Sequence, residues 1–407
     1  MNRKVAVAMS GGVDSSVAAA LAVEKYGADN VFGVTMKLFC YGDNESSDKS
    51  CCSIDAINDA ITVCRQIGIR HYVIDFEKEF AEAVIQDFVS EYEHSRTPNP
   101  CIICNSVIKF QYLLQKIEEL GAEILVTGHY ARIACDSEDK KHNTKHKNPT
   151  SCHPEEPGKL AGRREDLLEI ASSQASRNDV GQYYLLKGVD EKKDQSYFLY
   201  GIEPENLSKI WFPIGEMTKQ ETRQKAAELG LKTAQKTESQ DICFIQSNVA
   251  EFLSNKISLT GGDIVDKKEK MLGKHKGLPL YTIGQRKGLG GGLPETMYVV
   301  GFNSDKNELV VGRAADLESD RLEVDNFHWL VSTPSSPFTA TAKIRYNSEA
   351  AECKIYPSNE ERSSQLLSNN KIIITFDKSQ SAITPGQSVV IYDGEIVLGG
   401  GIISATL

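Results

Sequence analysis

The feature that most constrains this chain is a short glycine turn near its start, Ser10-Gly11-Gly12-Val13-Asp14-Ser15-Ser16. The turn follows an apolar strand pattern at residues 4–9 and opens a helical pattern at residues 14–26. Two adjacent glycines permit left-handed backbone angles and close approach of a ligand, and the amides at a helix N-terminus attract an anion. The sequence therefore predicts a cradle for nucleotide phosphates.

This turn differs from two common phosphate-binding loops. It has no lysine before the Ser/Thr pair, which a Walker A loop requires, and it lacks the G-x-G-x-x-G pattern of dinucleotide-binding folds. The alternative without function is an ordinary glycine-rich turn between a strand and a helix.

The first 130 residues repeat the alternation of strand and helix. Strand patterns at 31–37, 71–75 and 122–127 separate helix-length patterns at 53–67, 76–94 and 105–120. This order predicts right-handed crossovers and a parallel sheet covered on both faces, with ligands at the carboxyl ends of the strands. The polar segment 136–179 lacks periodic apolar positions, and we interpret it as an inserted mobile surface loop.

The later part of the chain changes character. A helix is expected at 218–229, capped by Thr218 with Glu221 three positions on and ended by Gly230. After about residue 251, short β-branched runs alternate with turn residues, and the apolar end at 396–404 suits the closing strand of a barrel. The expected fold class is α/β: an N-terminal doubly wound parallel sheet, a small central β-rich domain and a C-terminal β-barrel. The predicted domains are 1–245, 246–318 and 319–407.

Composition bears on compartment and partners. No apolar run approaches the roughly 20 residues of a membrane span, and no signal-peptide pattern precedes the first strand, so we expect a cytoplasmic protein without a membrane partner. Ten cysteines in a reducing compartment favour metal binding or thiol chemistry over disulfides. The net charge of −10 disfavours nucleic-acid binding, yet residues 256–287 carry eight Lys/Arg and three Asp/Glu, which leaves a local basic face.

Two segments carry candidate sulfur chemistry. In TPNPCIICN, residues 97–105, Cys104 is expected at the start of a helix, whose positive end lowers the pKa of a thiol and suits a nucleophile. In SQDICFI, residues 239–245, Cys243 lies in an apolar stretch, where a packing cysteine is the alternative. We interpret Cys40, Cys64 and Cys353 as packing residues.

The glycine turn resembles the loop of the ATP pyrophosphatases, or PP-loop superfamily. Together with TPNPCIICN, TGHYAR at 127–132, KKDQSYFL at 192–199, SQDICFI and YTIGQRKGLG at 281–290, it resembles the tRNA-specific 2-thiouridylases. The resemblance runs from about residue 3 to the C-terminus, interrupted mainly by segment 136–179. It implies ATP- and Mg²⁺-dependent 2-thiolation of the anticodon wobble uridine of tRNA, in which AMP is transferred to the C2 oxygen and sulfur then displaces it.

The resemblance also implies roles for single residues. Cys104 matches the nucleophile, Cys243 the cysteine that carries sulfur as a persulfide, and Asp14 the residue that helps place Mg²⁺. The implied ATP contacts are Ala8, Met9, Ser10, Gly11, Gly12, Val13, Asp14, Ser15, Met36 and Gly128. The target base falls at Asn99, Pro100 and Cys101. The implied tRNA contacts are His129, Lys193, Asp194, Gln195, Arg345, Tyr346 and Gln387. A persulfide or sulfide donor protein is the second implied partner.

One residue departs from the family pattern. Many members have Asp where this chain has Cys101, so Cys101, Cys104 and Cys243 could hold a [4Fe–4S] cluster that accepts sulfide. Because C-x-x-C also serves redox pairs, persulfide relay and cluster-assisted delivery both stay open. The basic region 267–287 is the main electrostatic candidate for tRNA, with a solvated basic hairpin as the alternative. Other candidate functions are a different PP-loop adenylating ligase, which would need no reactive thiol, and a non-catalytic tRNA-binding adaptor.

Overall fold

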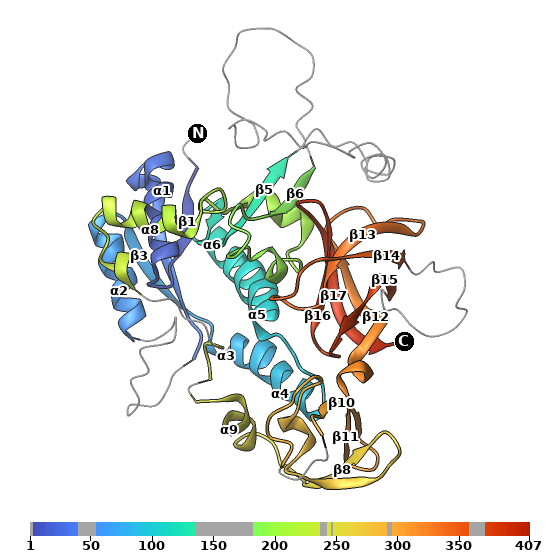
Figure 1. Ribbon diagram of the computed structural model, residues 1–407. Helices are drawn as coiled ribbons and strands as arrows, with labels where there is room; N and C mark the ends of the chain where they lie inside the picture. Colours follow the sequence, from blue (N-terminus) through green and yellow to red (C-terminus); the bar gives the residue numbers. More distant parts are fainter. Residues whose placement is uncertain are drawn as a thin grey trace.

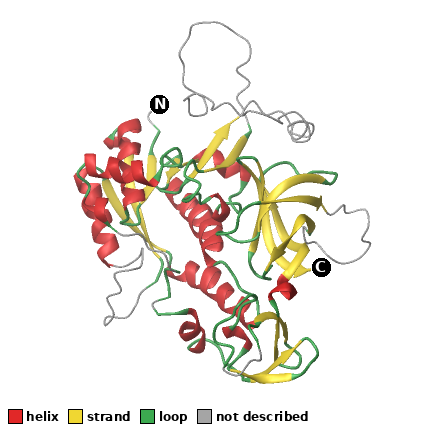
Figure 2. Ribbon diagram, viewed as in Figure 1, coloured by secondary structure: helices red, strands yellow, loops and turns green. Residues whose placement is uncertain are grey.

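The computed structural model describes residues 3–39, 54–135, 182–236, 242–245, 247–290, 295–357 and 371–407. These residues form a parallel sheet with helices, a small four-stranded sheet and a β-barrel, which confirms the predicted fold class (Figure 1). Figure 2 shows most of the helices around the parallel sheet and beside it, whereas strands dominate the barrel. The predicted insertion at 136–179 lies outside the described residues.

The parallel sheet has the order β3-β2-β1-β4-β7, and every neighbouring pair in it is parallel. Its strands are β1 (Val5–Ala8), β2 (Val31–Lys37), β3 (Arg70–Asp75), β4 (Ile124–Val126) and β7 (Ile210–Trp211). The strand order reverses between β1 and β4, and open α/β sheets bind ligands in the crevice at such a point. The topology therefore directs a ligand to the segments that follow β1 and β4.

Successive residues of β1 belong to two different cores, because side chains of a strand alternate between the faces of the sheet. Val5 and Val7 pack with α1 (Val13–Tyr26), α2 (Ile54–Gln66) and α8 (Lys219–Glu228). Ala6 packs on the other face with the second helical layer. That layer consists of α3 (Glu77–Phe80), η2 (Ala81–Ile85), α4 (Gln86–Glu93), α5 (Pro100–Ile103), η3 (Cys104–Leu113) and α6 (Leu114–Glu119).

The barrel closes because its first strand pairs with its last. The strands are β12 (Glu318–Trp329), β13 (Phe338–Lys343), β14 (Ala351–Pro357), β15 (Ile372–Ser381), β16 (Ser388–Asp393) and β17 (Ile396–Thr406). They follow the order β12-β15-β14-β13-β16-β17, and β12 also pairs with β17. The expected closing strand at the C-terminal end is thereby confirmed.

Two strands that the sequence did not reveal join the barrel sheet. β5 (Ala131–Cys135) and β6 (Tyr183–Lys187) form an antiparallel hairpin, and Leu186 of β6 pairs with Ile396 of β17. The hairpin belongs in sequence to the nucleotide-binding part and in space to the barrel sheet. It therefore links the two regions.

The small sheet lies at the bottom of Figure 1 and has its own apolar core. Its strands are β8 (Gly262–Asp266), β9 (Met271–His275), β10 (Tyr298–Asn303) and β11 (Glu308–Gly312), in the order β10-β11-β8-β9. The remaining elements are η1 (Ala28–Asn30), η4 (Ser196–Phe198), η5 (Pro204–Lys209), η6 (Lys232–Gln235), α9 (Val249–Ser254), η7 (Leu278–Leu280) and η8 (Ala314–Leu317). In the part of the chain that the structure describes, every helix is too short or too polar to cross a bilayer.

Candidate active site

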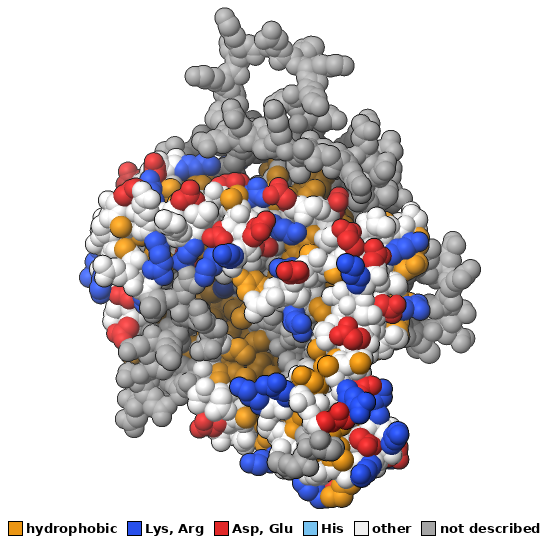
Figure 3. All heavy atoms as spheres, viewed as in Figure 1, with side chains coloured by type: hydrophobic (Ala, Val, Ile, Leu, Met, Phe, Trp, Pro, Cys, Tyr) orange, Lys and Arg blue, Asp and Glu red, His pale blue; other side chains and the backbone are white. Residues whose placement is uncertain are grey.

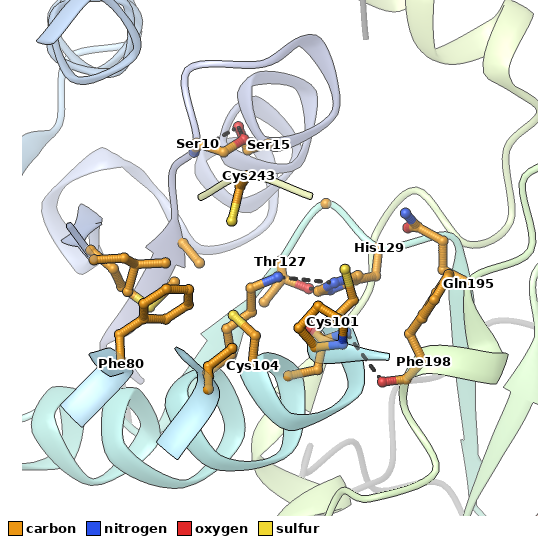
Figure 4. Close-up of a pocket in the computed structure, with 18 of the residues that line it drawn as sticks. Ser10, Ser15, Phe80, Cys101, Cys104, Thr127, His129, Gln195, Phe198 and Cys243 are labelled. Atoms are coloured by element: carbon orange, nitrogen blue, oxygen red, sulfur yellow. Dashed lines mark hydrogen bonds between the residues drawn. The ribbon is translucent and has the colours of Figure 1, made fainter. Parts of the chain in front are cut away.

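A cavity of about 370 Å³ opens where β1 and β4 end, within the roughly 300–1,000 Å³ typical of small-molecule sites (Figure 4). Two groups of its lining residues matter here. We call Ser10, Asp14, Ser15 and Gly128 the phosphate end, and Cys101, Cys104 and Cys243 the thiol end. The glycine turn and two cysteine segments far apart in the sequence thus share one cavity.

The phosphate end is a tight turn that excludes side chains at its glycines. Gly11 has φ +66°, and a Cβ there would lie 2.2 Å from the carbonyl oxygen of Ala56. A Cβ on Gly128 would lie 2.7 Å from the backbone of Asp14 and Ser15. The segment after β4 therefore packs directly on the N-terminus of α1. Gly12 occupies the N-cap of α1 and has no side chain to cap it, which suits the first amides to phosphate oxygens.

Hydrogen bonds between Ser10 and Ser15 fix the turn. The Ser10 amide donates to Oγ of Ser15 at 3.2 Å, and the two hydroxyls lie 3.1 Å apart. Ala8, Met9 and Met36, three of the expected ATP contacts, also line the cavity, whereas Gly11, Gly12 and Val13 shape the turn without lining it.

Asp14 is held by two partners that sequence reasoning missed. Nζ of Lys219 donates to both carboxylate oxygens of Asp14 at 2.8 Å, and the Tyr130 hydroxyl donates to Oδ1 at 2.8 Å. The Lys219 side chain is only 12% exposed, so this charge pair is largely shielded from water. The pair places a lysine next to the residue expected to organise Mg²⁺ and pyrophosphate.

The capping box predicted at Thr218 is confirmed, and it explains how Lys219 reaches this position. Thr218 and Glu221 exchange hydrogen bonds at the start of α8, and the Lys219 amide donates to Oδ2 of Asp190 at 2.9 Å. Lys219 is therefore the first residue of α8, and the hydrogen bond from its amide to Asp190 holds its backbone in place. Its position next to a capping threonine was visible in the sequence, but its partner lies 205 residues away.

The expected position of Cys104 at a helix start was wrong. The helix begins at Pro100, because Asn99 caps it by accepting a hydrogen bond from the Cys101 amide at 3.2 Å and proline suits the first helical position. Cys101 thus occupies the first turn, and Cys104 lies about one turn further on. The positive helix end acts mainly on Cys101. Pro100 and Cys101 line the cavity, and Asn99 supports them from outside it.

Cys243 is positioned by its aromatic neighbour. The ring of Phe244 packs against Phe80, Phe88 and Phe252 with centroids 5.7, 5.3 and 5.4 Å apart, which anchors the short described segment at 242–245. Figure 4 shows the Cys104 and Cys243 sulfurs pointing towards one another across the cavity, with Cys243 on the side of Ser10 and Ser15. The arrangement allows sulfur to reach a base held between them.

Two other thiols belong to the cores. Cys64 and Cys353 are buried, and burial raises the pKa of each thiol to about 12. At neutral pH they carry almost no thiolate, so their expected role as packing residues is confirmed. Cys40 lies outside the described residues.

His129 lines the wall between the two ends. Nδ1 of its ring lies 2.7 Å from Oγ1 of Thr127, and Nε2 lies 3.5 Å from Nζ of Lys109. Desolvation holds the pKa of His129 well below its usual 6.5, and the charge of Lys109 lowers it further. The neighbouring Gln195 also lines the cavity, and its Oε1 accepts a hydrogen bond from the Tyr130 amide at 3.0 Å.

The other implied tRNA contacts lie in different environments. Asp194 is buried, and its carboxylate accepts hydrogen bonds from Gly188 and Ser196, so it stabilises a turn. Lys193 beside it is partly exposed. Arg345 is exposed, whereas the ring of Tyr346 packs on Phe198 of the cavity wall at 4.5 Å.

Gln387 fastens the barrel to the loop before α5. Its Nε2 donates to the carbonyl oxygens of Thr97 at 2.7 Å and Pro98 at 3.4 Å, and the Thr97 amide donates to the Pro385 carbonyl. The side chain therefore supports the segment expected to hold the target base.

The residues at the two ends differ in what they could hold. Mg²⁺ is commonly bound by one or two carboxylates together with substrate phosphates, and Asp14 fits that requirement. Among the described residues, however, no three Cys, His, Asp or Glu side chains are close enough together to bind a metal ion. Cys101, Cys104 and Cys243 share the cavity, and a [4Fe–4S] cluster binds thiolates of this kind on separate irons.

The loop at the strand-order reversal, with its bonded serines and paired Asp14, defines a PP-loop type nucleotide-binding domain joined to two β modules. Three family models match the chain. A tRNA methyl transferase HUP domain matches residues 3–151 and 169–247, a tRNA methyl transferase PRC-barrel domain 250–313, and an aminomethyltransferase β-barrel domain 319–403.

Relatives match over nearly the whole chain. The tRNA-specific 2-thiouridylase MnmA of Geotalea uraniireducens is 41% identical, with 98% of this chain and 94% of the relative covered. That of Halothermothrix orenii is also 41% identical, with 98% of each covered, and that of Gloeothece citriformis is 40% identical, with 99% of each covered. The chain therefore belongs to the tRNA-specific 2-thiouridylase family.

Proposed function

We propose that this chain is an ATP-dependent tRNA-uridine 2-sulfurtransferase that thiolates the anticodon wobble uridine. The observation that carries the proposal is the single cavity in which the phosphate end meets Cys104 and Cys243. The names of the relatives support tRNA as the substrate and C2 of uridine as the reacting atom. A base in a single-stranded anticodon loop can enter such a cavity at lower cost than a base stacked in a helix.

The first step activates a poor electrophile. The C2 oxygen of uracil bonds to the α-phosphorus of ATP while the α–β phosphoanhydride bond breaks, and pyrophosphate leaves with the electron pair. The uracil N3 proton passes to solvent. The amides of α1 and the hydroxyls of Ser10 and Ser15 would hold the phosphates, and Asp14 would help to hold Mg²⁺, which neutralises charge on the leaving group.

Sulfur then replaces the adenylated oxygen. The terminal sulfur of a persulfide on Cys243 attacks C2, and the C2–O2 bond breaks as AMP leaves with its electron pair. The Cys104 thiolate attacks Sγ of Cys243, which cleaves the bond to the transferred sulfur and leaves 2-thiouridine and a Cys104–Cys243 disulfide. A dithiol reductant restores the thiols, and a persulfide or sulfide donor protein reloads Cys243.

We propose persulfide relay over a cluster because the sulfurs of Cys104 and Cys243 face one another across the cavity, as sulfur transfer followed by disulfide formation requires. Anaerobic purification tests this choice. We expect metal-free protein to thiolate tRNA at full rate once Cys243 is loaded with persulfide. The cluster would instead be supported by three results together: stoichiometric iron, an absorbance shoulder at about 400 nm, and activity that requires the iron.

Binding of tRNA is assigned to the later regions. Figure 3 shows hydrophobic side chains in the hollow at the middle of one face and Lys and Arg side chains on its rim and on the lower lobe. In the turn between β8 and β9 and in the segment that follows β9, exposed cations include Lys268, Lys270, Lys276, Arg286 and Lys287. These cations suit backbone contacts to RNA, which position a substrate without reading its sequence.

One incubation tests the proposed function. The protein is mixed with ATP, Mg²⁺, a sulfide source and unmodified tRNA, and the nucleosides are analysed by mass spectrometry. We expect an exchange of oxygen for sulfur on uridine that requires ATP. Adenylation without a sulfur product, or activity unaffected by loss of both Cys104 and Cys243, would favour another PP-loop ligase, and tRNA binding without pyrophosphate release would favour an adaptor.

A further inference from the structure

Lys109 is the one lysine or arginine among the described residues that line the cavity. It is partly buried, and its Nζ lies 3.5 Å from Nε2 of His129. None of the roles proposed for the other cavity residues requires the charge of Lys109, although Lys109 lines the same cavity as Cys104 and Cys243. Its position therefore calls for a functional explanation.

The local helix geometry brings Lys109 to the same wall as Cys104. Both residues belong to η3, which has π-helical hydrogen bonds between residues five apart, and both line the cavity. In an α-helix a spacing of five residues would separate the two side chains by about 140° around the axis. The wider winding instead places them about one turn apart on one side of the helix. π-Helical segments occur frequently at functional sites.

The hydrogen bonds of His129 show that this residue does not offset the charge of Lys109. A lysine ammonium can only donate, so Nε2 of His129 accepts and Nδ1 carries the hydrogen that is donated to Oγ1 of Thr127. His129 is thus neutral and does not offset the charge. Among the residues that the structure describes, no carboxylate forms an ion pair with Lys109. A partly desolvated cation of this kind favours a cavity ligand that brings negative charge.

We propose that Lys109 is a catalytic residue whose ammonium contacts the α-phosphoryl oxygens of ATP while the uracil is adenylated. The role rests on the proposed function. The new bond between O2 and the α-phosphorus must form between the phosphate end and the thiol end, and Lys109 lines the same cavity. It shares η3 with Cys104, and it reaches the segment of Gly128 through His129.

The chemistry of this step explains why a cation is needed there. As O2 bonds to phosphorus and pyrophosphate departs with its electron pair, negative charge stays on the non-bridging α-phosphoryl oxygens. A preorganised cation in a cavity with little water stabilises that charge strongly. Lys219 is committed to another group, because two of its three N–H donors are bonded to the carboxylate oxygens of Asp14.

Three substitutions of Lys109 separate charge from structure. Lys109→Met removes both the charge and the hydrogen bond, whereas Lys109→Gln keeps an N–H donor for His129 and removes only the charge. Lys109→Arg retains the charge. Lys116→Met is the matched control, because Lys116 lies on the following helix, α6, with a half-exposed side chain paired with Glu119.

The measurement is formation of adenylated tRNA from ATP labelled at the α-phosphate, in a Cys243→Ser background that cannot carry the persulfide and so blocks sulfur transfer. We expect both neutral variants to adenylate tRNA about 100-fold more slowly, as when one transition-state donor is lost. The arginine variant should recover at least a tenth of the rate, and the affinity for ATP and the melting temperature should change little.

Three outcomes would overturn the assignment. Adenylation by Lys109→Met at nearly the normal rate would show that the charge is not used, and recovery by Lys109→Gln would show that Lys109 only orients His129. Normal adenylation by Lys109→Met with slow sulfur transfer, measured with both Cys104 and Cys243 intact, would move the role of Lys109 to the thiols. If the protein with native Lys109 releases no pyrophosphate in response to tRNA, the proposed function fails and this role fails with it.

Discussion

The phosphate end and the thiol end of the cavity are built in different ways. At the phosphate end, side chains are bonded to one another before any substrate arrives: Ser10 with Ser15, and Asp14 with Lys219. At the thiol end, Cys104 and Cys243 come from separate segments and line the cavity together with Phe80 and Phe244. Fixed dipoles suit charge stabilisation. In the proposed persulfide relay, by contrast, two sulfurs react with a base and then with each other, so they need space to approach.

Removing one thiol should separate the two ends most completely. Cys243→Ser is expected to reduce thiolation by more than about 10³-fold, because serine cannot carry a persulfide and a nucleophile of this kind has no substitute. Release of pyrophosphate in response to tRNA should persist, since the phosphate end is untouched. The readouts are nucleoside mass spectrometry and a pyrophosphate assay.

Cys104→Ser is likewise expected to lose thiolation while release of pyrophosphate in response to tRNA persists. Cys353→Ala is the control, because that thiol is buried in the barrel and its pKa is raised to about 12 by burial. Loss of both activities together in Cys243→Ser would mean that Cys243 supports the nucleotide site and does not deliver sulfur.

Replacing Lys219, the cation paired with Asp14, should weaken ATP binding and leave the loading of sulfur intact. Lys219→Met leaves Asp14 without its bidentate partner and removes a positive charge beside the expected pyrophosphate position. We expect the Km for ATP to rise about tenfold, in keeping with the loss of one charge-assisted contact. Persulfide loading of Cys243 should be unchanged.

Lys225→Met serves as the control for Lys219, because Lys225 lies on the same helix and pairs with Glu24 at the surface. The opposite result, tighter ATP binding by Lys219→Met, would show that Lys219 competes with Mg²⁺ for Asp14 and restrains the site.

The contrast between the ends also separates what the sequence could predict from what it could not. The glycine turn was predictable because its conformation is local: Gly11 needs a positive φ, and the turn joins a strand directly to a helix. The capping box at Thr218 was predictable for the same reason. The pairing of Lys219 with Asp14 was not, since it depends on how two helices distant in the chain pack together.

Other misses have the same origin or a local signal that was overlooked. The β5–β6 hairpin attaches to the barrel through strand β17, more than 200 residues further along the chain, so no local pattern reports it. The burial of Asp194 follows from the turn that it completes. The start of the helix at Pro100 was visible, however, because Asn followed by Pro suits the N-cap and the first helical position.

A smaller effect is expected where the barrel supports the thiol end. Gln387→Leu removes the hydrogen bonds to the carbonyl oxygens of Thr97 and Pro98 and should loosen the segment that precedes Cys101. We expect kcat for thiolation to fall about fivefold, in line with the loss of one or two hydrogen bonds of about 1 kcal/mol each. ATP affinity should not change.

Gln380→Leu is the matched control for Gln387, because the Gln380 amide bonds only to nearby carbonyls of its own exposed strand. The family resemblance implies that Gln387 contacts tRNA. A rise in the Km for tRNA with an unchanged kcat would support that direct contact and contradict the supporting role.

The smallest effect should come from the cap that holds Lys219 in place. Thr218→Ala removes the N-cap of α8, which typically lowers the free energy of unfolding by about 1 kcal/mol, and the Km for ATP should rise only about twofold. Hydrogen bonds from the backbone and the side chain of Thr218 hold the pKa of Glu221 below its usual 4.5. The stabilisation from this carboxylate is therefore present above pH 4.5 and is lost as the pH falls through the lowered pKa. Urea unfolding should show the difference between the two proteins narrowing below that pH, and Thr218→Ser should restore both properties. A difference in stability that stays constant down to pH 3 would mean that Thr218 contributes through packing and that Glu221 plays no part in the cap.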